Sequence, residues 1–307
     1  MVRLLLQRIL EGLVALVLVV VIVFLMGRVI GNPVDALLPS TASAQERHDL
    51  YLRLGLDRPV PEQLVDYFGM LMKGDLGQSP YSGLDVSTVL KERLPNSIEL
   101  AVSATALSIL VSVPLAVLAA SRRNSKWDHL AGAFALGGQA APPFWLGLIL
   151  IFIFAVRFQV LPAAGTGSLE YLVLPSLTLG WFLCAGLIRL LRGALVEVLS
   201  SDYVLFARSL GLPNWRVVWV YALPNAIVSA LTFLGFMFGV MIAGAVVVET
   251  VFVWPGLGQL AYQAILDRDF AVLQGVVLVW AILIVVANIA VDIAYGAIDP
   301  RVRAGAH

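Results

Sequence analysis

The residues best suited to chemistry lie in one stretch, Asp202 to Pro224, and the chemistry that they suit is the binding of a partner. The stretch reads DYVLFARSLGLPNWRVVWVYALP and separates two long apolar runs. Large apolar and aromatic side chains dominate protein interfaces and can anchor a short helix in a groove. They suit equally a helix that lies among lipid headgroups, where Trp and Tyr concentrate. The candidate anchors are Leu205, Phe206, Leu210, Trp215 and Trp219.

Helix-breaking residues divide this stretch at defined points. Residues 200–202, Ser-Ser-Asp, favour a helix start because their side-chain oxygens can accept bonds from the first N–H groups. Gly211 stands where a left-handed residue would end that helix. Pro213 suits the first turn of a second helix, and Pro224 predicts that the chain stops or kinks there. The pattern predicts a short helix, a tight turn and a second short helix.

The rest of the sequence offers no catalytic arrangement. It has no phosphate-binding loop with Gly-Lys-Thr and no HExxH, and the Gly-Leu-Gly at 256–258 predicts a turn. His48, His129 and His307 are far apart, and Cys184 is alone, so neither an intrachain disulfide nor a Cys/His metal set is expected. We therefore expect no enzyme, no metal site and no cofactor bound by this chain.

Composition and hydropathy indicate a membrane protein. Of the 307 residues, 60% are hydrophobic and 13% are charged, and the mean hydropathy is +0.92, whereas a soluble domain carries about 25% charged residues. The net charge of zero offers no basic field for nucleic acid. About 20 apolar residues cross a bilayer. Six such runs occur: Ile9 to Ile30, Ile98 to Ala120, about Leu130 to Val156, about Tyr171 to Leu191, about Ala226 to Val248 and about Val272 to Tyr295.

The stretch between the fourth and fifth runs resembles the cytoplasmic coupling loop of ABC importer permeases. That loop has the pattern EAA, three residues, Gly, nine residues, Ile-x-Leu-Pro. In this chain the pattern falls on Leu205, Phe206, Ala207, Gly211, Tyr221, Leu223 and Pro224. The Gly to Leu-Pro spacing matches in full, whereas Leu205, Phe206 and Tyr221 replace Glu, Ala and Ile. The phrase DYVLFARSLGL resembles the DYVRTARAKGL of the peptide and nickel permease subfamily, where the leading Glu is usually absent too.

A polar section between the first and second runs extends this resemblance. Its segments NPVDALLP, LGLDRPVPEQLVDYF, KGDLGQSPYSG and VLKERLPNSIEL look like the outward-facing insertion of the same subfamily. With them, the resemblance covers essentially the whole chain. It implies an all-α polytopic membrane protein with six transmembrane helices, an extracytoplasmic insertion after the first helix and a cytoplasmic coupling-helix hairpin between the fourth and fifth.

The resemblance implies the membrane-spanning permease subunit of an ATP-driven importer for di- or oligopeptides, with nickel chelates, glutathione or another small solute as alternatives. Its partners would be a homologous second permease, two ABC ATPase subunits that carry ATP and Mg, an extracytoplasmic solute-binding protein and membrane lipid, in a bacterial or archaeal plasma membrane. The residues assigned to ATPase coupling are Asp202, Tyr203, Leu205, Phe206, Ala207, Arg208, Gly211, Trp215, Leu223 and Pro224. Arg208 could instead be only a marker of the cytoplasmic side.

Basic residues in short loops predict the orientation. One side holds Arg3, Arg8, Arg122, Arg123, Lys126, Arg189, Arg192, Arg208, Arg216, Arg301 and Arg303, and the opposite short loops hold little more than Arg157 and Arg268. We therefore expect both termini to be cytoplasmic. The expected division is a cytoplasmic end and first helix at 1–30, an extracytoplasmic insertion at 31–96, a transmembrane core at 97–295 with the coupling loop at 197–224, and a cytoplasmic tail at 296–307.

Four residues inside or near the apolar runs are candidates for the translocation path. Glu249 is an ionisable group at the end of the fifth run, where it could equally cap a helix or meet water. Gln139, Pro142 and Asn288 interrupt the third and sixth runs. Irregular backbone at membrane depth can line a cavity, or it can only permit close helix packing. A face of Gly235, Met237, Gly239, Met241 and Gly244 predicts packing against the second permease.

Two rival classes are a secondary transporter that works alone and an intramembrane enzyme. The first predicts ionisable residues at mid-membrane for a coupling ion, and the deep runs are nearly empty of them. The second requires polar residues that converge at one depth, and no such set is apparent. Both are less consistent with the sequence than an importer subunit.

Overall fold

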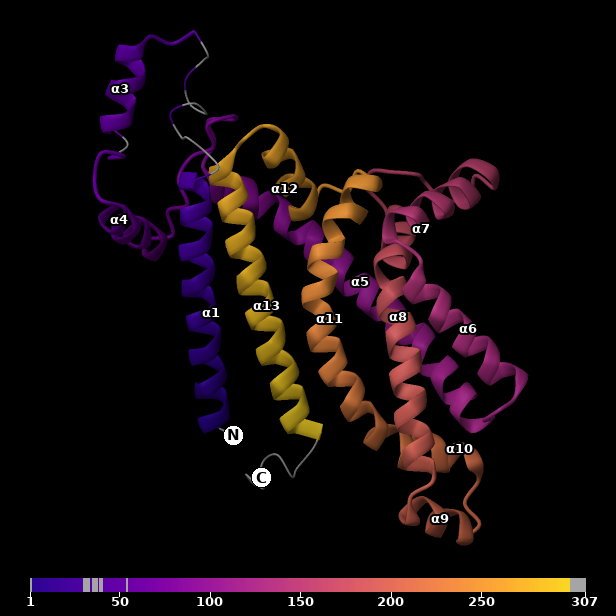
Figure 1. Cartoon of the computed structure of the whole chain (residues 1–307). Coiled ribbons are helices and arrows are strands. Elements are labelled where there is room, and N and C mark those ends of the chain that lie inside the picture. Colours follow the sequence, from indigo (N-terminus) through magenta and orange to yellow (C-terminus); the bar gives the residue numbers. More distant parts are fainter. Residues whose placement is uncertain (1, 30–33, 35–37, 39–40, 54, 299–307) are drawn as a thin grey trace. The chain divides into compact units, whose positions relative to one another are not determined.

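The computed structural model describes residues 2–29, 34, 38, 41–53 and 55–298. Within them every named element is a helix, and the extended contact is a single β-bridge between Gln78 and Asp85. The elements (Figure 1) are α1 Val2–Val29, α3 Ala44–Arg53, α4 Val60–Met72, α5 Val86–Ser121, α6 Lys126–Ala140, α7 Pro143–Leu150, the π-helical η1 Ile151–Arg157, α8 Leu169–Leu199, α9 Asp202–Ser209, α10 Asn214–Arg216, the π-helical η2 Val217–Ala222, α11 Leu223–Val251, α12 Leu257–Leu266 and α13 Phe270–Ile298. The all-α prediction is confirmed.

Four helices are long and apolar enough to cross a membrane: Gln7–Gly27, Val86–Ser121, Leu169–Leu199 and Phe270–Ile293. Two bent helix pairs raise the number to six if each pair is one span. These pairs are Lys126–Ala140 with Pro143–Arg157, bent by 109°, and Asn214–Val228 with Ala230–Ile242, bent by 50°. The four single helices and two bent pairs occupy the six apolar runs of the sequence.

The third predicted span is broken where its prolines predict irregular backbone. Ala141 ends α6 with extended backbone (ψ 125°), because a residue before proline is pushed out of the helical region. Pro142 is also extended (φ −62°, ψ 137°), and Pro143 begins α7 in a position where no N–H is needed. The two prolines thus account for the sharp bend between α6 and α7.

Helix α5 begins at Val86, twelve residues before the Ile98 that hydropathy gives as the start of the second span. Contacts with distant residues, and not an apolar composition, stabilise its first turns. Val86 is buried, Asn96 Nδ2 donates to Pro255 O at 2.8 Å, and Ser97 Oγ accepts from Leu257 N at 2.7 Å. Packing therefore extends the helix through a polar segment that contains Pro95.

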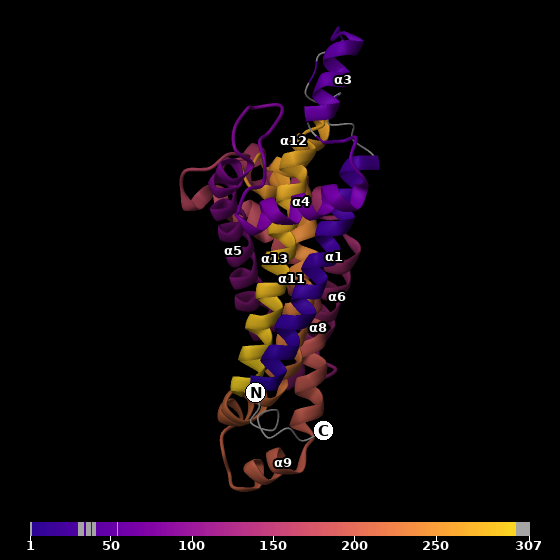
Figure 2. The same ribbon diagram turned by 90° about the vertical axis from the view of Figure 1, so that its left-hand side faces the viewer.

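The chain divides into two compact units, Leu6–Ser97 with Pro255–Val285, and Met1–Leu5 with Ile98–Trp254 and Val286–His307. In the first, α1 and the first half of α13 lie side by side (Figures 1 and 2), and Gln274 Nε2 donates to Val23 O at 3.3 Å. Phe24 of α1 contacts Tyr67 of α4 with ring centroids 5.5 Å apart. Its apolar core joins the start of α5 to α12 and to α13.

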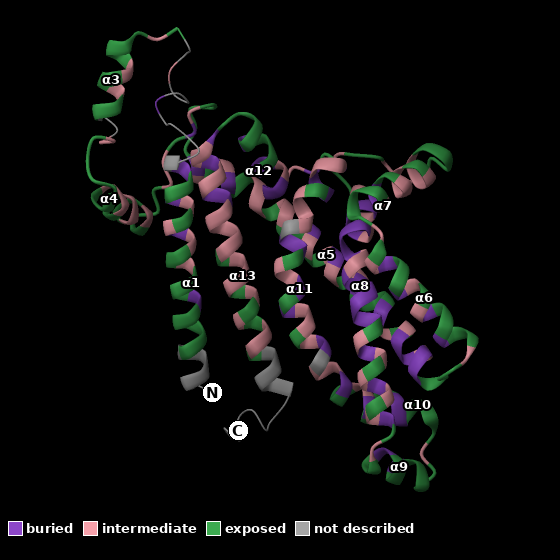
Figure 3. Ribbon diagram, in the orientation of Figure 1, coloured by how far each residue is buried: buried purple, intermediate pink, exposed green. Residues whose placement is uncertain are grey.

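The second unit is built around α8, which packs against α6, α7 and α11 and is the most buried of the apolar helices (Figure 3). Glycines on α8 permit this packing. A Cβ at Gly180 would lie 2.6 Å from Ala104 O. Ser108 Oγ lies 2.7 Å from both Ala104 O and Gly180 O, which share its one hydroxyl proton as acceptors. This unit carries the candidate functional hairpin at the end of α8.

Part of the small-residue face of α11 is covered by this chain itself. Met237 and Met241 are buried in the core of the second unit. Gly235 approaches Val291 of α13, whose Cγ1 would lie 3.2 Å from an added Cβ. The prediction that these residues face a second permease subunit is therefore wrong for Met237, Met241 and Gly235, because intrachain packing covers them.

Candidate functional site

The hairpin begins where α8 ends and α9 starts. Ser201 occupies the N-cap position of α9 with extended backbone (φ −76°, ψ 153°), as the sequence predicts. Its hydroxyl, however, donates to Val198 O at 2.6 Å, and no side chain caps the helix. The predicted side-chain cap is wrong, because the serine hydroxyl bonds backward to the last turn of α8. Asp202 places a carboxylate in the first turn of α9, where the helix dipole favours it.

Gly211 ends α9 in the left-handed region, with φ +73°, as predicted. The turn is closed by Leu210 N, which donates to Phe206 O at 3.2 Å, and by Gly211 N, which donates to Arg208 O at 2.9 Å. No atom lies within 4 Å of the place where a Cβ would stand. Glycine is therefore favoured at this position by the backbone conformation and not by lack of space.

Two prolines shape the second arm of the hairpin. Pro213 is the N-cap of α10, and its carbonyl accepts from Arg216 N at 2.9 Å and from Val217 N at 3.2 Å. Pro224 lies in the first turn of α11 and does not stop the helix. Of the two effects predicted for it, a stop or a kink, the stop is therefore wrong. The π-helical η2 comes directly before it, a distortion typical of helices that accommodate a missing N–H.

The hairpin has two different faces. Val204, Ala207, Val217, Val218 and Ala222 are buried against the chain's own core. The predicted anchors are all exposed, with Phe206 at 65% and Trp215 at 60%. Leu205, Leu210 and Trp219 share this exposure, as does Tyr203. The structure thus brings every predicted anchor to the surface of one short segment, while the alternate positions hold that segment to the helices behind it.

Arg216 is partly engaged within the hairpin. Its Cζ lies 5.5 Å from the centroid of the Trp215 ring, a cation–π arrangement that restricts both side chains. Arg208 is exposed at the last turn of α9. Leu223 is half-buried and Pro224 is exposed, so the Leu-Pro end of the motif lies at the boundary between the two faces.

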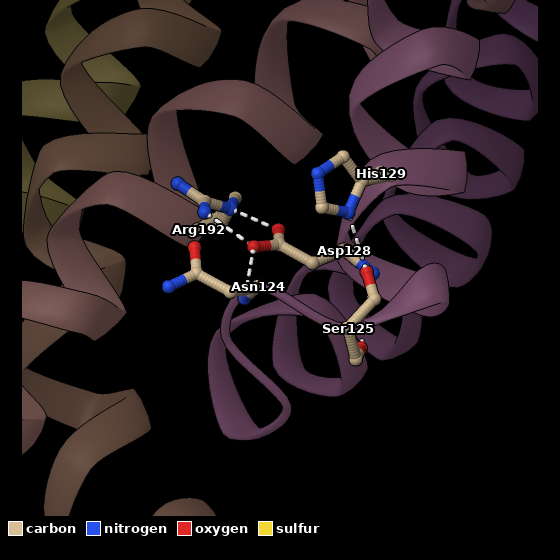
Figure 4. Close-up of polar contacts among 5 residues, drawn as sticks. All are labelled: Asn124, Ser125, Asp128, His129 and Arg192. Carbon is tan, nitrogen blue, oxygen red and sulfur yellow. Dashed lines mark hydrogen bonds and ion pairs between the residues drawn. The ribbon is translucent and has the colours of Figure 1, made fainter.

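A salt bridge that the sequence analysis missed braces the helix behind the hairpin (Figure 4). Arg192 of α8 binds Asp128 of α6 through two hydrogen bonds, Nε to Oδ1 at 2.5 Å and Nη2 to Oδ2 at 2.7 Å. Asn124 N also donates to Asp128 Oδ2, at 2.9 Å. Asp128 is buried, so both carboxylate oxygens are satisfied away from water. The only local signal was Ser125 three residues before Asp128, which predicts a helix start but no partner.

The four candidate path residues lie on different elements of the same unit. Gln139 is half-buried on α6, Pro142 is exposed between α6 and α7, and Asn288 is exposed on α13. Glu249 is 0% exposed near the end of α11. Its carbonyl accepts from Trp254 N at 2.8 Å, which closes the end of that helix. Their common role in a path stays a prediction.

Beyond Glu249 the backbone carries an outlier that the sequence did not indicate. Val253 has φ +50°, a conformation that is rare for a β-branched residue. Its neighbours Phe252 and Trp254 are both buried, and Phe252 O accepts from Gly165 N at 3.0 Å. Val253 itself is exposed, so the strain places its two neighbours in the core. The predicted tail is 296–307; its first three residues belong to α13, and residues 299–307, with Arg301 and Arg303, lie outside the described residues.

Comparison with known proteins gives consistent results. Residues 112–304 match the family described as "Binding-protein-dependent transport system inner membrane component". The chain is 35% identical over 305 residues to the dipeptide transport system permease protein DppB of Escherichia coli (strain K12), covering 89% of this chain and 90% of that one. It is 37% identical over 325 residues to the probable D,D-dipeptide transport system permease protein DdpB of the same strain, covering 96% of each.

A third relative is a putative peptide transport system permease protein of Brucella abortus (strain 2308), 37% identical over 312 residues and covering 99% of each chain. Among solved structures, the inward-facing MetNI methionine ABC transporter has a similar fold, with a TM-score of 0.60 and 18% identity over 69% of this chain and 96% of that chain. These matches confirm the resemblance: the chain belongs to the family of binding-protein-dependent transport system inner membrane components.

Proposed function

We propose that this chain is the membrane-spanning permease subunit of an ATP-driven importer that takes up di- or oligopeptides delivered by a solute-binding protein. The proposed substrate class is that of its relatives, which are named as dipeptide and peptide permeases. Nickel chelates, glutathione or another small solute are the alternatives within the same type of importer. ATP and Mg act on partner ATPase subunits, and this chain supplies the membrane passage.

The hairpin of α9, α10 and η2 is the proposed docking site for an ATPase subunit. The observation that carries this proposal is the division of its faces: Phe206 and Trp215 are exposed, whereas Val204 and Val217 are buried against the permease core. Exposed aromatic anchors favour binding in a groove. Because the opposite face packs on the ends of α8 and α11, movement of the ATPase would be transmitted to those helices.

The remaining parts of the chain have proposed places in the same importer. Both termini and the hairpin at 197–224 are cytoplasmic, and residues 31–96 form the extracytoplasmic insertion that faces the binding protein. A homologous second permease completes the passage. Gln139, Pro142, Glu249 and Asn288 are the proposed polar points along it. The buried Glu249 lies at a helix end and is the most sensitive of the four to substitution.

Co-purification tests the docking assignment. The double variant F206A/W215A should lose most of the ATPase that co-purifies with the wild-type chain, since truncation of an aromatic anchor costs about 2 kcal/mol or more of binding free energy. The matched control is F144A/W145A, which removes a Phe and a Trp of similar exposure (50% and 52%) from α7. Equal recovery of the ATPase with both double variants would contradict docking and favour a hairpin that lies on lipid.

A further inference from the structure

A cavity lies between the membrane helices and the hairpin. It has a volume of about 290 Å³, is open to the surface, and is lined by the last turns of α5 and α8 on one side and by α9, α10 and η2 on the other. Its floor is apolar, with Val117 of α5 and Leu199 of α8. All of these elements belong to the second compact unit. The cavity is therefore a property of one packed region of the chain.

The polar lining of the cavity is strongly biased toward cations and donors. Arg123 and Arg208 both line it, together with Asn214 and the hydroxyl-bearing Ser121. No Asp or Glu contributes to its walls in the described part of the chain. A cavity that holds two guanidinium groups and no carboxylate attracts an anion, and the planar guanidinium suits a phosphate in particular.

Neither arginine is neutralised among the residues that the structure describes. Some arginines there form ion pairs, as Arg192 does with Asp128, Arg8 with Glu11 and Arg58 with Asp66. By contrast, no hydrogen bond or ion pair involves the side chain of Arg123 or Arg208 in the described residues. Two guanidinium groups without an ion pair on the wall of one cavity favour the binding of an anion between them.

The position of the cavity selects the kind of anion. It is lined by the last turns of two candidate spans, Val86–Ser121 and Leu169–Leu199, and a span of this kind ends where lipid headgroups meet the hydrocarbon layer. Trp215 and Trp219 line it, and tryptophan concentrates at that level. A ligand that fills it should therefore combine an anionic phosphate with an apolar body, which is the chemistry of an anionic phospholipid.

We infer that the cavity binds the phosphate headgroup of an anionic phospholipid, held by Arg123 and Arg208, with its glycerol end against the apolar floor. The bound lipid would fill the space between the hairpin and the ends of α5 and α8. It would thereby stabilise the hairpin in the position in which its exposed aromatic side chains face the ATPase subunit. This role is additional to the proposed ATPase docking. The exposed anchors Phe206 and Leu210 do not line the cavity, whereas Trp215 and Trp219 do, so the lipid test leaves both tryptophans unchanged.

Native mass spectrometry of the purified full chain with its co-purifying subunits tests the inference. The preparation is titrated with phosphatidylglycerol, with phosphatidylcholine and with inorganic phosphate. We expect phosphatidylglycerol to bind most tightly, and R123Q and R208Q each to weaken it about tenfold, since each removes a charge-assisted hydrogen-bonding group. R189Q, which removes an exposed arginine of α8 outside the cavity, should bind as the wild type does. R123K, which keeps the charge but not the planar guanidinium, should lose less affinity than R123Q.

Four outcomes would overturn the inference. Unchanged lipid binding in R123Q and R208Q, or an equal loss in R189Q, would show that the cavity is not the site. Displacement of the lipid by an equal concentration of inorganic phosphate would assign the cavity to a soluble phosphate. If R123Q retains the lipid but loses the ATPase, the partner of Arg123 is a carboxylate of that subunit. Lipid binding and ATPase recovery are measured separately. If the wild-type chain recruits no ATPase, that result contradicts the proposed function and not the lipid site.

Discussion

Arg192 holds Asp128 through two parallel hydrogen bonds that join α8 to the first turn of α6, across 64 residues of sequence (Figure 4). The pair lies two turns before the end of α8, where the hairpin begins. Because α8 also packs against α11 and α7, this bond connects the support of the hairpin to both arms of the broken helix pair. It is the clearest example of a long-range contact that fixes the frame behind the candidate site.

Removing the carboxylate of this pair should destabilise the chain. Asp128→Ala leaves the Arg192 guanidinium without its partner, and the loss of a charge-assisted pair at a largely buried site costs about 2 kcal/mol. The thermal unfolding midpoint of the purified chain measures it. The control is Asp66→Ala, which breaks the exposed pair with Arg58 and should cost under about 1 kcal/mol. Equal midpoints for the two variants would contradict the bracing role.

Gly211 should tolerate only residues that accept positive φ. Its φ of +73° disfavours a β-branched residue, although the space for a side chain is open. Gly211→Val should therefore abolish uptake while leaving membrane insertion intact, and Gly211→Asn should retain most of it. Peptide uptake and membrane abundance, measured together, test this. Normal uptake and ATPase recruitment by the valine variant would count against the coupling role of the turn.

Gly180 should be intolerant of any side chain. A Cβ there would lie 2.6 Å from Ala104 O and from Ser108 Oγ, and the backbone oxygen cannot move aside cheaply. Gly180→Ala should lower stability by about 1–3 kcal/mol through overpacking. Gly193 lies on the same helix with no atom within 4 Å of an added Cβ, so Gly193→Ala should be neutral or slightly stabilising. A thermal midpoint for Gly180→Ala at or above that of Gly193→Ala would show that α5 and α8 are not so closely packed.

Val253 offers a stabilising substitution. Its φ of +50° is unfavourable for a β-branched side chain, and 54% of the residue is exposed, so little burial is lost when it is replaced. Val253→Asn should raise stability by about 1 kcal/mol, because Asn visits the left-handed region more readily. The matched control is Val160→Asn, at an exposed valine without positive φ, which should show no gain. A lower midpoint for Val253→Asn would mean that the valine side chain makes a contact that outweighs its strain.

The hairpin could be predicted from the sequence because its determinants are local. Gly211 and Pro213 act within one or two residues of themselves, and both have the backbone that their types require. Hydropathy likewise located the membrane helices, since the length of an apolar run can be read directly from the sequence. The cap at Ser201 could not be predicted, because its hydroxyl has an equally good acceptor in the preceding turn.

The features that the sequence did not reveal depend on contacts between distant segments. Arg192 is indistinguishable by type from the arginines that mark membrane orientation, and only the fold places Asp128 beside it. The early start of α5 depends on side-chain bonds from Asn96 and Ser97 to residues about 160 positions away. The small-residue face of α11 gave no indication of whether its neighbour was another subunit or, as Met237 shows, the chain's own core.

Photo-crosslinking from the hairpin tests the central claim most directly. A photoreactive benzoyl-phenylalanine in place of Phe206, in the complex assembled in membranes, should crosslink to an ATPase subunit, and the yield should change between nucleotide-free and ATP-bound states. The same group in place of Phe144, which is also exposed, should crosslink to lipid or to membrane subunits. Crosslinks from position 206 to lipid alone, in both nucleotide states, would contradict the assignment of this hairpin as the point where the ATPase drives the permease.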